Sequence, residues 1–162
     1  MQLQRLRELA PARLADTTLD DVEDDDSEKC SPFGLVDLWA AADEWRMWAE
    51  IADDTADDPV VPAEDMQSHP AGAIKLVYAS KQRLPIWLDG SGNGIAVDFD
   101  PGPAGKVGQV ICYGSDDCDD MAVFGDSVTA FLRNCRALFE RDSNVSDLVA
   151  ALRAHLHNLQ ET

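Results

Sequence analysis

The feature that most constrains the fold is a glycine-punctuated stretch spanning residues 84–111. Three glycines, at 90, 92 and 94, separate a short apolar run from an alternating run that ends at Asp100. On one face of that run lie Ile95, Val97 and Phe99. After a Pro- and Gly-rich turn, a third run has a face made of Val107, Gln109, Ile111 and Tyr113. Such alternation between turn residues predicts a three-stranded meander with one buried face.

The segments before this meander carry weaker signals. Leucines at positions 3, 6, 9 and 14, interrupted by Pro11, predict a short N-terminal helix, and residues 16–34 resemble an acidic connector. Asp37 is suited to cap a helix whose apolar face includes Trp45 and Trp48. Because this helix carries a third tryptophan, Trp39, we favour packing of the tryptophans in the core over a role as exposed anchors. Residues 53–70 are expected to form a loop, and 74–79 a strand.

The segments after the meander predict one more strand and two helices. The strand covers residues 121–124, and Asp126 or Ser127 caps the first helix. That helix has apolar residues at 128, 131, 132, 135, 138 and 139. The last helix, capped by Ser143 or Ser146, repeats the spacing at 145, 148, 149, 152, 156 and 159. We therefore expect one α+β domain over residues 1–162, with helices packed on a meander-rich sheet of about five or six strands.

Negative charge is concentrated in one third of the chain. Residues 16–65 contain eighteen acids against Lys29 and Arg46, whereas the whole chain carries a formal charge of −18. Such a field repels nucleic acid and anionic membranes, and it attracts basic partners. The alternative for the run 20–28 is a solvated acidic segment that keeps the protein soluble, and for this run we favour it.

The cysteines and the N-terminus favour a reducing, cytoplasmic location. Cysteines at 30, 112, 118 and 135 show no Cys-x-x-Cys spacing, which argues against a zinc site and a secreted disulfide framework. Residues 1–15 lack the apolar core of a signal peptide, and no apolar run approaches membrane-spanning length.

No group of residues in the sequence predicts an enzyme or a cofactor. The loop from Asp89 to Asp100 places oxygen ligands almost as a calcium-binding loop does, but Pro85 and Pro101 exclude the flanking helices that such a loop needs. We therefore interpret its glycines as a hairpin turn, and expect no bound metal. Asp98 and Asp100 lack a neighbouring nucleophile, and Cys118 lies among acids that oppose thiolate formation.

Several of these segments together resemble a known family. The Pro85-Ile86 pair, the Asp-Gly-Ser-Gly-Asn-Gly turn over 89–94, the strand ending in Asp-Phe-Asp-Pro at 98–101, and Val-Gly-Gln-Val-Ile at 107–111 resemble the SUKH superfamily. The helix start at 127–132 is similar as well. The chain departs from the pattern at Trp87, which follows the Pro-Ile pair instead of preceding it, and residues 1–34 resemble a divergent or partly disordered acidic segment.

The resemblance implies the fold predicted above and a binding function. Bacterial SUKH proteins are largely immunity proteins that neutralise toxins, many of them nucleases, so the main expectation is a cytoplasmic antitoxin that binds a basic toxin. The alternatives are a regulatory scaffold of the fungal cell-wall assembly regulator type, and a small metal protein or enzyme. The candidate partner-binding residues are Asp43, Glu44, Glu50, Asp53, Asp54, Asp57, Asp58, Trp87, Asp89, Asp98, Asp116 and Asp117.

Overall fold

The sheet is built around the predicted meander. The computed structural model describes residues 36–116, 119–141 and 147–160. The meander strands are β2 (Arg83–Leu88), β3 (Asn93–Asp98) and β4 (Gln109–Gly114), and β5 (Asp120–Gly125) follows them antiparallel. A short strand β1 (Gln67–His69) pairs in parallel with β5, which completes the order β1-β5-β4-β3-β2. The expected α+β fold, with a sheet of about five or six strands, is therefore confirmed, and the sheet has five strands in a mixed arrangement.

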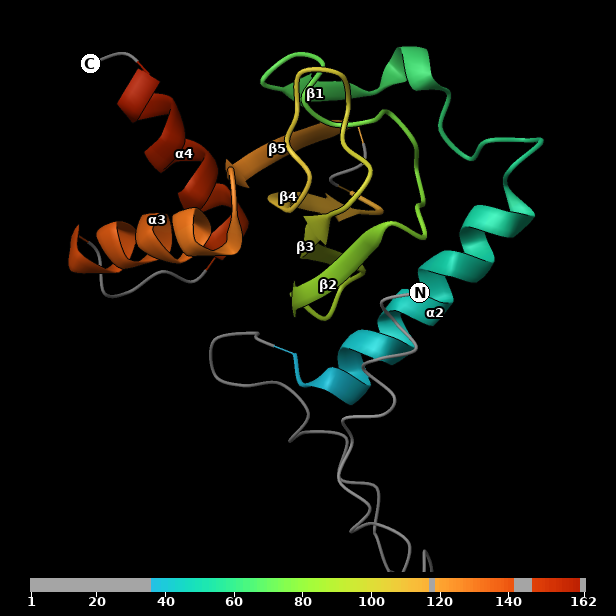
Figure 1. The fold of residues 1–162 in the computed structure, drawn as a ribbon, viewed down its shortest axis with the longest axis horizontal. Helices are drawn as coiled ribbons and strands as arrows, with labels where there is room; N and C mark the ends of the chain where they lie inside the picture. The colour runs from blue at the N-terminus through green and yellow to red at the C-terminus, as the bar shows by residue number, and fades with distance from the viewer. Residues whose placement is uncertain (1–35, 117–118, 142–146, 161–162) are drawn as a thin grey trace, which may run out of the picture.

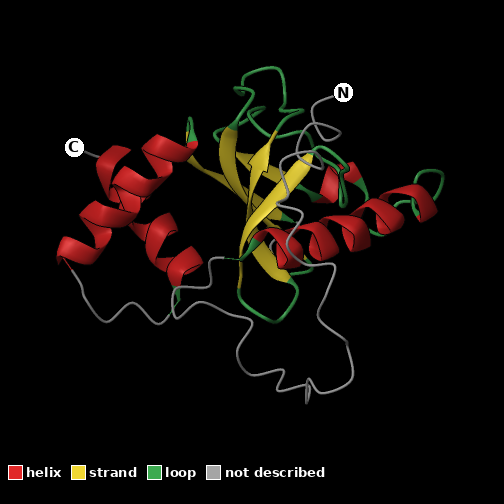
Figure 2. Ribbon diagram, turned by 60° about the horizontal axis from the view of Figure 1, so that its bottom comes forward, coloured by secondary structure: helices red, strands yellow, loops and turns green. Residues whose placement is uncertain are grey.

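Helices cover both faces of this sheet (Figures 1 and 2). Helix α2 (Leu38–Asp54) packs on one face, where Trp48 contacts Ala96 and Tyr113. Helices α3 (Val128–Arg141) and α4 (Leu148–Gln160) pack on the other. Strands β3 and β4 are consequently buried along their whole length, and the expectation of a single buried face is wrong. Alternation of apolar and polar residues shows that the two faces of a strand differ in polarity, but it does not exclude that helices pack on both faces.

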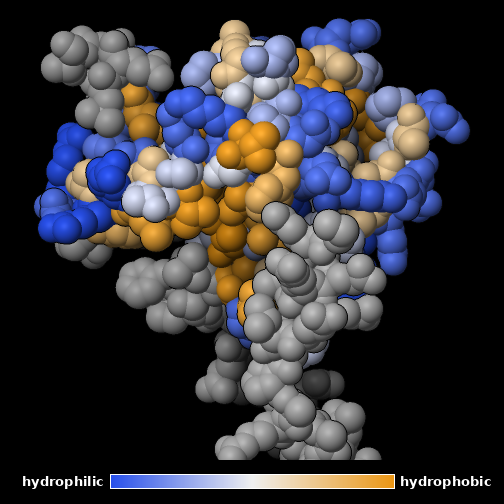
Figure 3. Space-filling model, viewed as in Figure 1, coloured by the Kyte–Doolittle hydropathy of each residue, from blue (hydrophilic) through white to orange (hydrophobic). Residues whose placement is uncertain are grey.

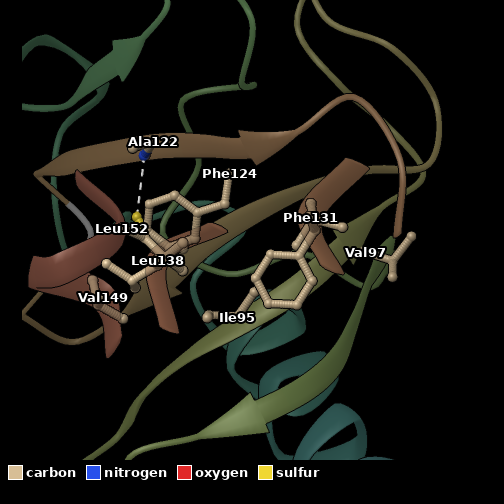
Figure 4. Close-up of a cluster of buried hydrophobic side chains, with 10 residues drawn as sticks. Ile95, Val97, Ala122, Phe124, Phe131, Leu138, Val149 and Leu152 are labelled. Atoms are coloured by element: carbon tan, nitrogen blue, oxygen red, sulfur yellow. Dashed lines mark hydrogen bonds between the residues drawn. The ribbon is translucent and has the colours of Figure 1, made fainter. Parts of the chain in front are cut away.

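The largest core lies under α3 and α4 (Figure 4). Ile95, Val97, Val110, Cys112, Ala122 and Phe124 of the sheet meet Phe131, Leu138, Val149 and Leu152 of the helices. A second core on the opposite face joins Met66 and Ile74 to Ile111 and Met121. Ile111 is thus buried as predicted, but its side chain belongs to this second core and not to the core that contains Phe131.

Three predicted core residues are exposed. Phe99 is 45% exposed, Leu132 53% and Phe139 37%. Helix α3 lies against β4 and β5, so only a narrow arc that contains Phe131 and Leu138 reaches the sheet. The apolar arc of α3 is wider than the arc that contacts the sheet. The spacing of apolar residues shows where a helix is apolar, but it does not show how much of that surface another element covers.

Two segments differ from their predicted secondary structure. Residues 74–79 form no strand, because the Arg83 guanidinium binds the carbonyl oxygens of Lys75 and Val77 at 3.0 and 3.1 Å and holds this segment in an irregular path. The predicted loop over 53–70 contains a short 3₁₀ helix η1 (Ala63–Asp65) and strand β1. Strand β1 has three residues, too few for an alternating pattern to be detected.

The caps of the first two helices follow the sequence. The Asp37 carboxylate accepts from the amides of Trp39 and Ala40 at 2.8 Å, and the Ser127 hydroxyl accepts from Ala130 at 3.2 Å. Helix α4 differs, since Asp147 accepts from Ala150 at 3.0 Å and the helix begins at Leu148. The predicted caps Ser143 and Ser146 lie outside the described residues, as do the predicted N-terminal helix and the acidic segment before residue 36.

Candidate partner-binding surface

One side of α2 is fixed to the sheet by its tryptophans. Trp48 is 5% exposed, and its ring lies edge-on to Tyr113 with centroids 5.4 Å apart. The Trp48 indole N–H donates to Glu44 Oε1 at 2.7 Å, and the Trp45 indole donates to the Lys81 carbonyl at 2.9 Å. Burial raises the pKa of the Tyr113 hydroxyl, and the nearby Glu44 carboxylate raises it further. These contacts determine which side of α2 faces solvent.

The opposite side carries what we call the α2 ridge, which consists of Trp39, Asp43, Met47, Glu50 and Asp54. Successive members are three or four positions apart, so they form one row along the helix. Trp39 is 72% exposed and Met47 43% exposed. The core interpretation is therefore correct for Trp48 and wrong for Trp39. An exposed tryptophan and methionine among carboxylates are residue types that are enriched where proteins bind one another.

Acidic residues also gather at the C-terminal end of α2. Asp53 and Asp54 lie in the last turn, Asp57 and Asp58 follow just beyond it, and the last turn contains no basic residue. The C-terminus of a helix carries partial negative charge, so each carboxylate in that turn destabilises the helix by about 0.3–1 kcal/mol. Only Asp53 of these four has a cationic partner among the described residues, Lys81 Nζ at 2.5 Å. Helix stability does not explain this arrangement.

The second predicted group of carboxylates lies at the β2–β3 turn. Asp89 accepts from the amide and hydroxyl of Ser91 at 2.7 and 2.6 Å, and from the amide and side chain of Asn93 at 3.1 Å. Asn93 also donates to Asp116 Oδ2 at 3.1 Å, which joins this turn to the start of the β4–β5 turn. Partial burial acts to raise the pKa of Asp89, but these hydrogen bonds outweigh it and lower the pKa. The Asp89 carboxylate thus stabilises its own hairpin.

The calcium-like spacing of this loop does not produce a calcium-like cluster. Asp89 and Asn93 lie at one end of β3, whereas Asp100 follows the other end and pairs with Lys75 at 2.7 Å. Over the described ranges, no group of three or more His, Cys, Asp or Glu residues is placed to hold a metal ion. No helix in those same ranges is long and apolar enough to cross a membrane.

The remaining candidates have different positions from those expected. Asp98 is 2% exposed and accepts from the Gln109 side-chain amide at 3.0 Å, so its expected place on an exposed face is wrong. Trp87 is half-buried beside the core under α3. Glu44 is half-buried against Trp48. Asp117 lies outside the described residues. The structure thus brings together Asp43, Glu50, Asp53 and Asp54 on α2, and separately Asp89 and Asp116.

Sequence reasoning missed the apolar members of the α2 ridge. The sequence predicts a core position for Trp39 with the other tryptophans, and it indicates no role for Met47. A signal was present, because Trp39 and Met47 are eight positions apart in line with Asp43, and Trp48 lies on another side of the helix.

Comparison with known proteins relates this chain to fungal regulators. It is 33% identical over 128 residues to the cell wall biosynthesis and cell cycle regulator smi1 of Schizosaccharomyces pombe, a match that covers 71% of this chain and 25% of that protein. It is 43% identical over 58 residues to the cell wall assembly regulator SMI1 of Saccharomyces cerevisiae, covering 36% of this chain and 11% of the relative. A KNR4/SMI1 homolog of Yarrowia lipolytica is 43% identical over 74 residues, covering 46% and 10% respectively.

The chain thus spans a quarter or less of the length of these relatives. They are named as regulators or as homologs of a regulator, and not as enzymes. No protein-family model matches the chain.

Proposed function

We propose that this chain is a non-enzymatic regulatory domain of the cell-wall assembly regulator type, that it belongs to the SUKH superfamily, and that it acts by binding other proteins. The observation that carries the proposal is the 33% identity to the fission-yeast regulator over 71% of this chain. Because the chain spans 25% of that protein, the proposal concerns the binding activity of this domain and not every activity of the relative.

The α2 ridge is the proposed binding surface. Trp39 and Met47 supply the large apolar contact area that dominates binding energy, and the carboxylates of Asp43, Glu50 and Asp54 surround them. A partner with a basic segment that carries an apolar or aromatic residue is complementary to this row in both charge and polarity. The acids at the C-terminal end of α2, which disfavour the helix itself, extend the same negative surface toward residue 58.

A cytoplasmic immunity function remains a second candidate, with a basic toxin as the partner. The observation that favours it is the concentration of eighteen acids over residues 16–65, ten of which lie among the described residues 36–65. An acidic inhibitor can occupy the basic surface that a nuclease presents to nucleic acid. The regulator names of the relatives favour the first candidate over this one.

The test is a genetic one in the organism that encodes the chain. Deleting the gene should increase sensitivity to wall-digesting enzymes, and the wild-type chain should restore resistance. The variant Trp39→Ala/Met47→Ala should fail to restore it, because it removes the apolar anchors without touching a buried residue. Val60→Ala/Val107→Ala is the matched control, since these side chains are 58% and 71% exposed elsewhere on the surface.

Two results separate the candidates. Unchanged wall resistance in the deletion strain would contradict the regulatory proposal. If that strain is instead killed by a toxin encoded beside the gene, and the wild-type chain protects it, the immunity function is the correct one. Full restoration by Trp39→Ala/Met47→Ala would exclude the α2 ridge as the binding surface in either case.

A further inference from the structure

A second exposed row of residues lies on helix α3. It consists of Val128, Leu132, Arg133 and Arg136, which we call the α3 ridge. Leu132 is 53% exposed and Val128 41% exposed. The Arg133 side chain makes no hydrogen bond or ion pair with another described residue, and Arg136 pairs along the helix with Glu140 at 2.8 Å. Figure 3 shows apolar and hydrophilic side chains next to one another over this helix, at the left of the view.

The two ridges are opposite in charge. The α3 ridge carries Arg133 and Arg136, with Glu140 paired to Arg136, whereas the α2 ridge carries Asp43, Glu50 and Asp54, with Arg46 paired to Asp43. This contrast is local, because the chain as a whole carries −18. Each ridge also presents apolar side chains, Trp39 and Met47 on α2, and Val128 and Leu132 on α3. The two surfaces are therefore complementary in both charge and polarity.

The ridges also lie on opposite sides of the molecule. Helix α2 packs on the sheet face that contains Ala96 and Tyr113, whereas α3 packs on the face that contains Ile95 and Val97. Figures 1 and 2 show the two helices on opposite sides of the sheet. One molecule thus cannot bring its own ridges together without unfolding, but two molecules can.

We propose that a second copy of this chain docks its α2 ridge on the α3 ridge of the first. Such a contact is head-to-tail, since it uses two different surfaces and leaves one of each free at the ends of the assembly. It therefore extends to a third copy and beyond unless the rotation between neighbours closes a ring. The inference goes beyond the proposed function, because it needs no other protein.

The association is weak. A contact of one helix on another buries less than the roughly 1,200 Å² typical of stable complexes, which is in the range of transient encounters. The net charge opposes it at long range, but at physiological salt the screening length is about 8 Å, so the facing ridges decide the outcome. We expect a dissociation constant on the order of 0.1–1 mM.

The test is sedimentation equilibrium of the full chain at about 150 mM salt, up to about 1 mM protein. The weight-average mass of the wild type should rise with concentration and pass that of a dimer. Arg133→Glu/Arg136→Glu makes both ridges acidic, and Glu50→Lys/Asp54→Lys makes both basic, so each variant alone should stay monomeric. An equimolar mixture of the two should associate again, because it restores facing ridges of opposite charge.

A matched control separates the ridges from net charge. Lys75→Glu changes the charge as much as Arg133→Glu alone does, but Lys75 pairs with Asp100 and lies on neither helix. It should associate at least half as well as the wild type, whereas Arg133→Glu should associate less. Leu132→Ser should weaken association several-fold without changing any charge. Circular dichroism verifies that each variant is folded.

Four outcomes would overturn the proposal. These are a monomeric wild type over the whole concentration range, a mass that stops at the dimer, a lysine control as impaired as the arginine variant, and a mixture that remains monomeric. None of these outcomes bears on the wall phenotype that tests the proposed function, so the two proposals fail separately.

Discussion

At the scale of single residues, the three turn glycines are required for two different reasons, a positive φ and the close approach of neighbouring strands. Gly90 and Gly92 have φ of +81° and +99°, a backbone region that other residues rarely adopt. Gly94 has no such φ, but a Cβ there would lie 2.7 Å from the Trp87 carbonyl oxygen and 2.9 Å from the Tyr113 ring. The pattern of three glycines thus reflects backbone conformation at Gly90 and Gly92, and close approach of neighbouring strands at Gly94.

Alanine at these three positions should destabilise the protein to increasing extents. Gly90→Ala meets no atom within 4 Å and should cost only the backbone penalty, about 1–2 kcal/mol. Gly92→Ala adds a 3.2 Å contact with the Ser115 hydroxyl, and Gly94→Ala should cost most, because backbone must move. Urea unfolding measures the series. Micromolar, stoichiometric calcium binding that Asp89→Ala abolishes would show instead that this loop serves a metal.

Asp89 should make the stability of the fold depend on pH. Its folded-state pKa is lowered by hydrogen bonds from Ser91 and Asn93, so the unfolded chain binds the proton more tightly. The stabilisation is therefore present above about pH 4 and is lost as pH falls through the folded-state pKa. Urea unfolding of wild type and Asp89→Asn should give stabilities that differ at about pH 6 and converge toward pH 2. A difference that stayed constant with pH would contradict the role given to this carboxylate.

At the scale of elements, helix α3 separates apolar pattern from burial. Phe131 and Leu132 are neighbours and both fit the apolar spacing, yet Phe131 is 2% exposed and Leu132 53%. The sheet contacts one arc of the helix, and the spacing extends beyond that arc. The same reasoning applies to α2, where Trp48 is buried and Trp39 is not.

Truncating these two neighbours should have very different effects. Phe131→Ala removes a ring from the main core and should cost about 3–5 kcal/mol in the free energy of unfolding. Leu132→Ala should cost less than about 0.5 kcal/mol, because its side chain is already solvated. Chemical denaturation of both variants measures the contrast. Equal costs would mean that α3 is rotated about its axis relative to the arrangement described above.

At the scale of the whole molecule, charge is distributed unevenly between the two helical layers. Ten acids and one base lie between residues 36 and 65, whereas α3 has an excess of arginine. Long-range attraction of a basic partner should therefore act mainly through the α2 side of the molecule.

Reversing Asp53, Asp54, Asp57 and Asp58 to Lys should slow the association of a basic partner and leave the fold intact. Long-range attraction governs the association rate more than the dissociation rate, so the effect should shrink as salt rises. Helix stability should not fall by much, since lysine suits the C-terminal end of a helix, although the Asp53–Lys81 pair is lost. The triple variant that retains Asp53 is the control for that pair.

Stopped-flow association at several salt concentrations measures this prediction. Binding with unchanged, salt-insensitive kinetics would mean that these acids only solubilise the protein. The interface would then have to be sought among the turns that carry Asp89 and Asp116.

Local pattern determined much of this protein by itself. Alternation located β3 and β4, side-chain chemistry located the caps at Asp37 and Ser127, and the turn glycines located the hairpin between β2 and β3. Each of these depends on residues within a few positions of one another, so the sequence holds the full physical cause.

Only the tertiary structure decided which faces are covered and which remain free. Asp98 is buried where the side-chain amide of Gln109, on the next strand, donates to its carboxylate. Strand β1 exists because β5 offers it a parallel edge. The two ridges are surfaces because the sheet contacts the other sides of α2 and α3. Periodicity shows that a helix or strand has an apolar side, but burial is a contact between segments distant in the chain, and no local pattern specifies the partner.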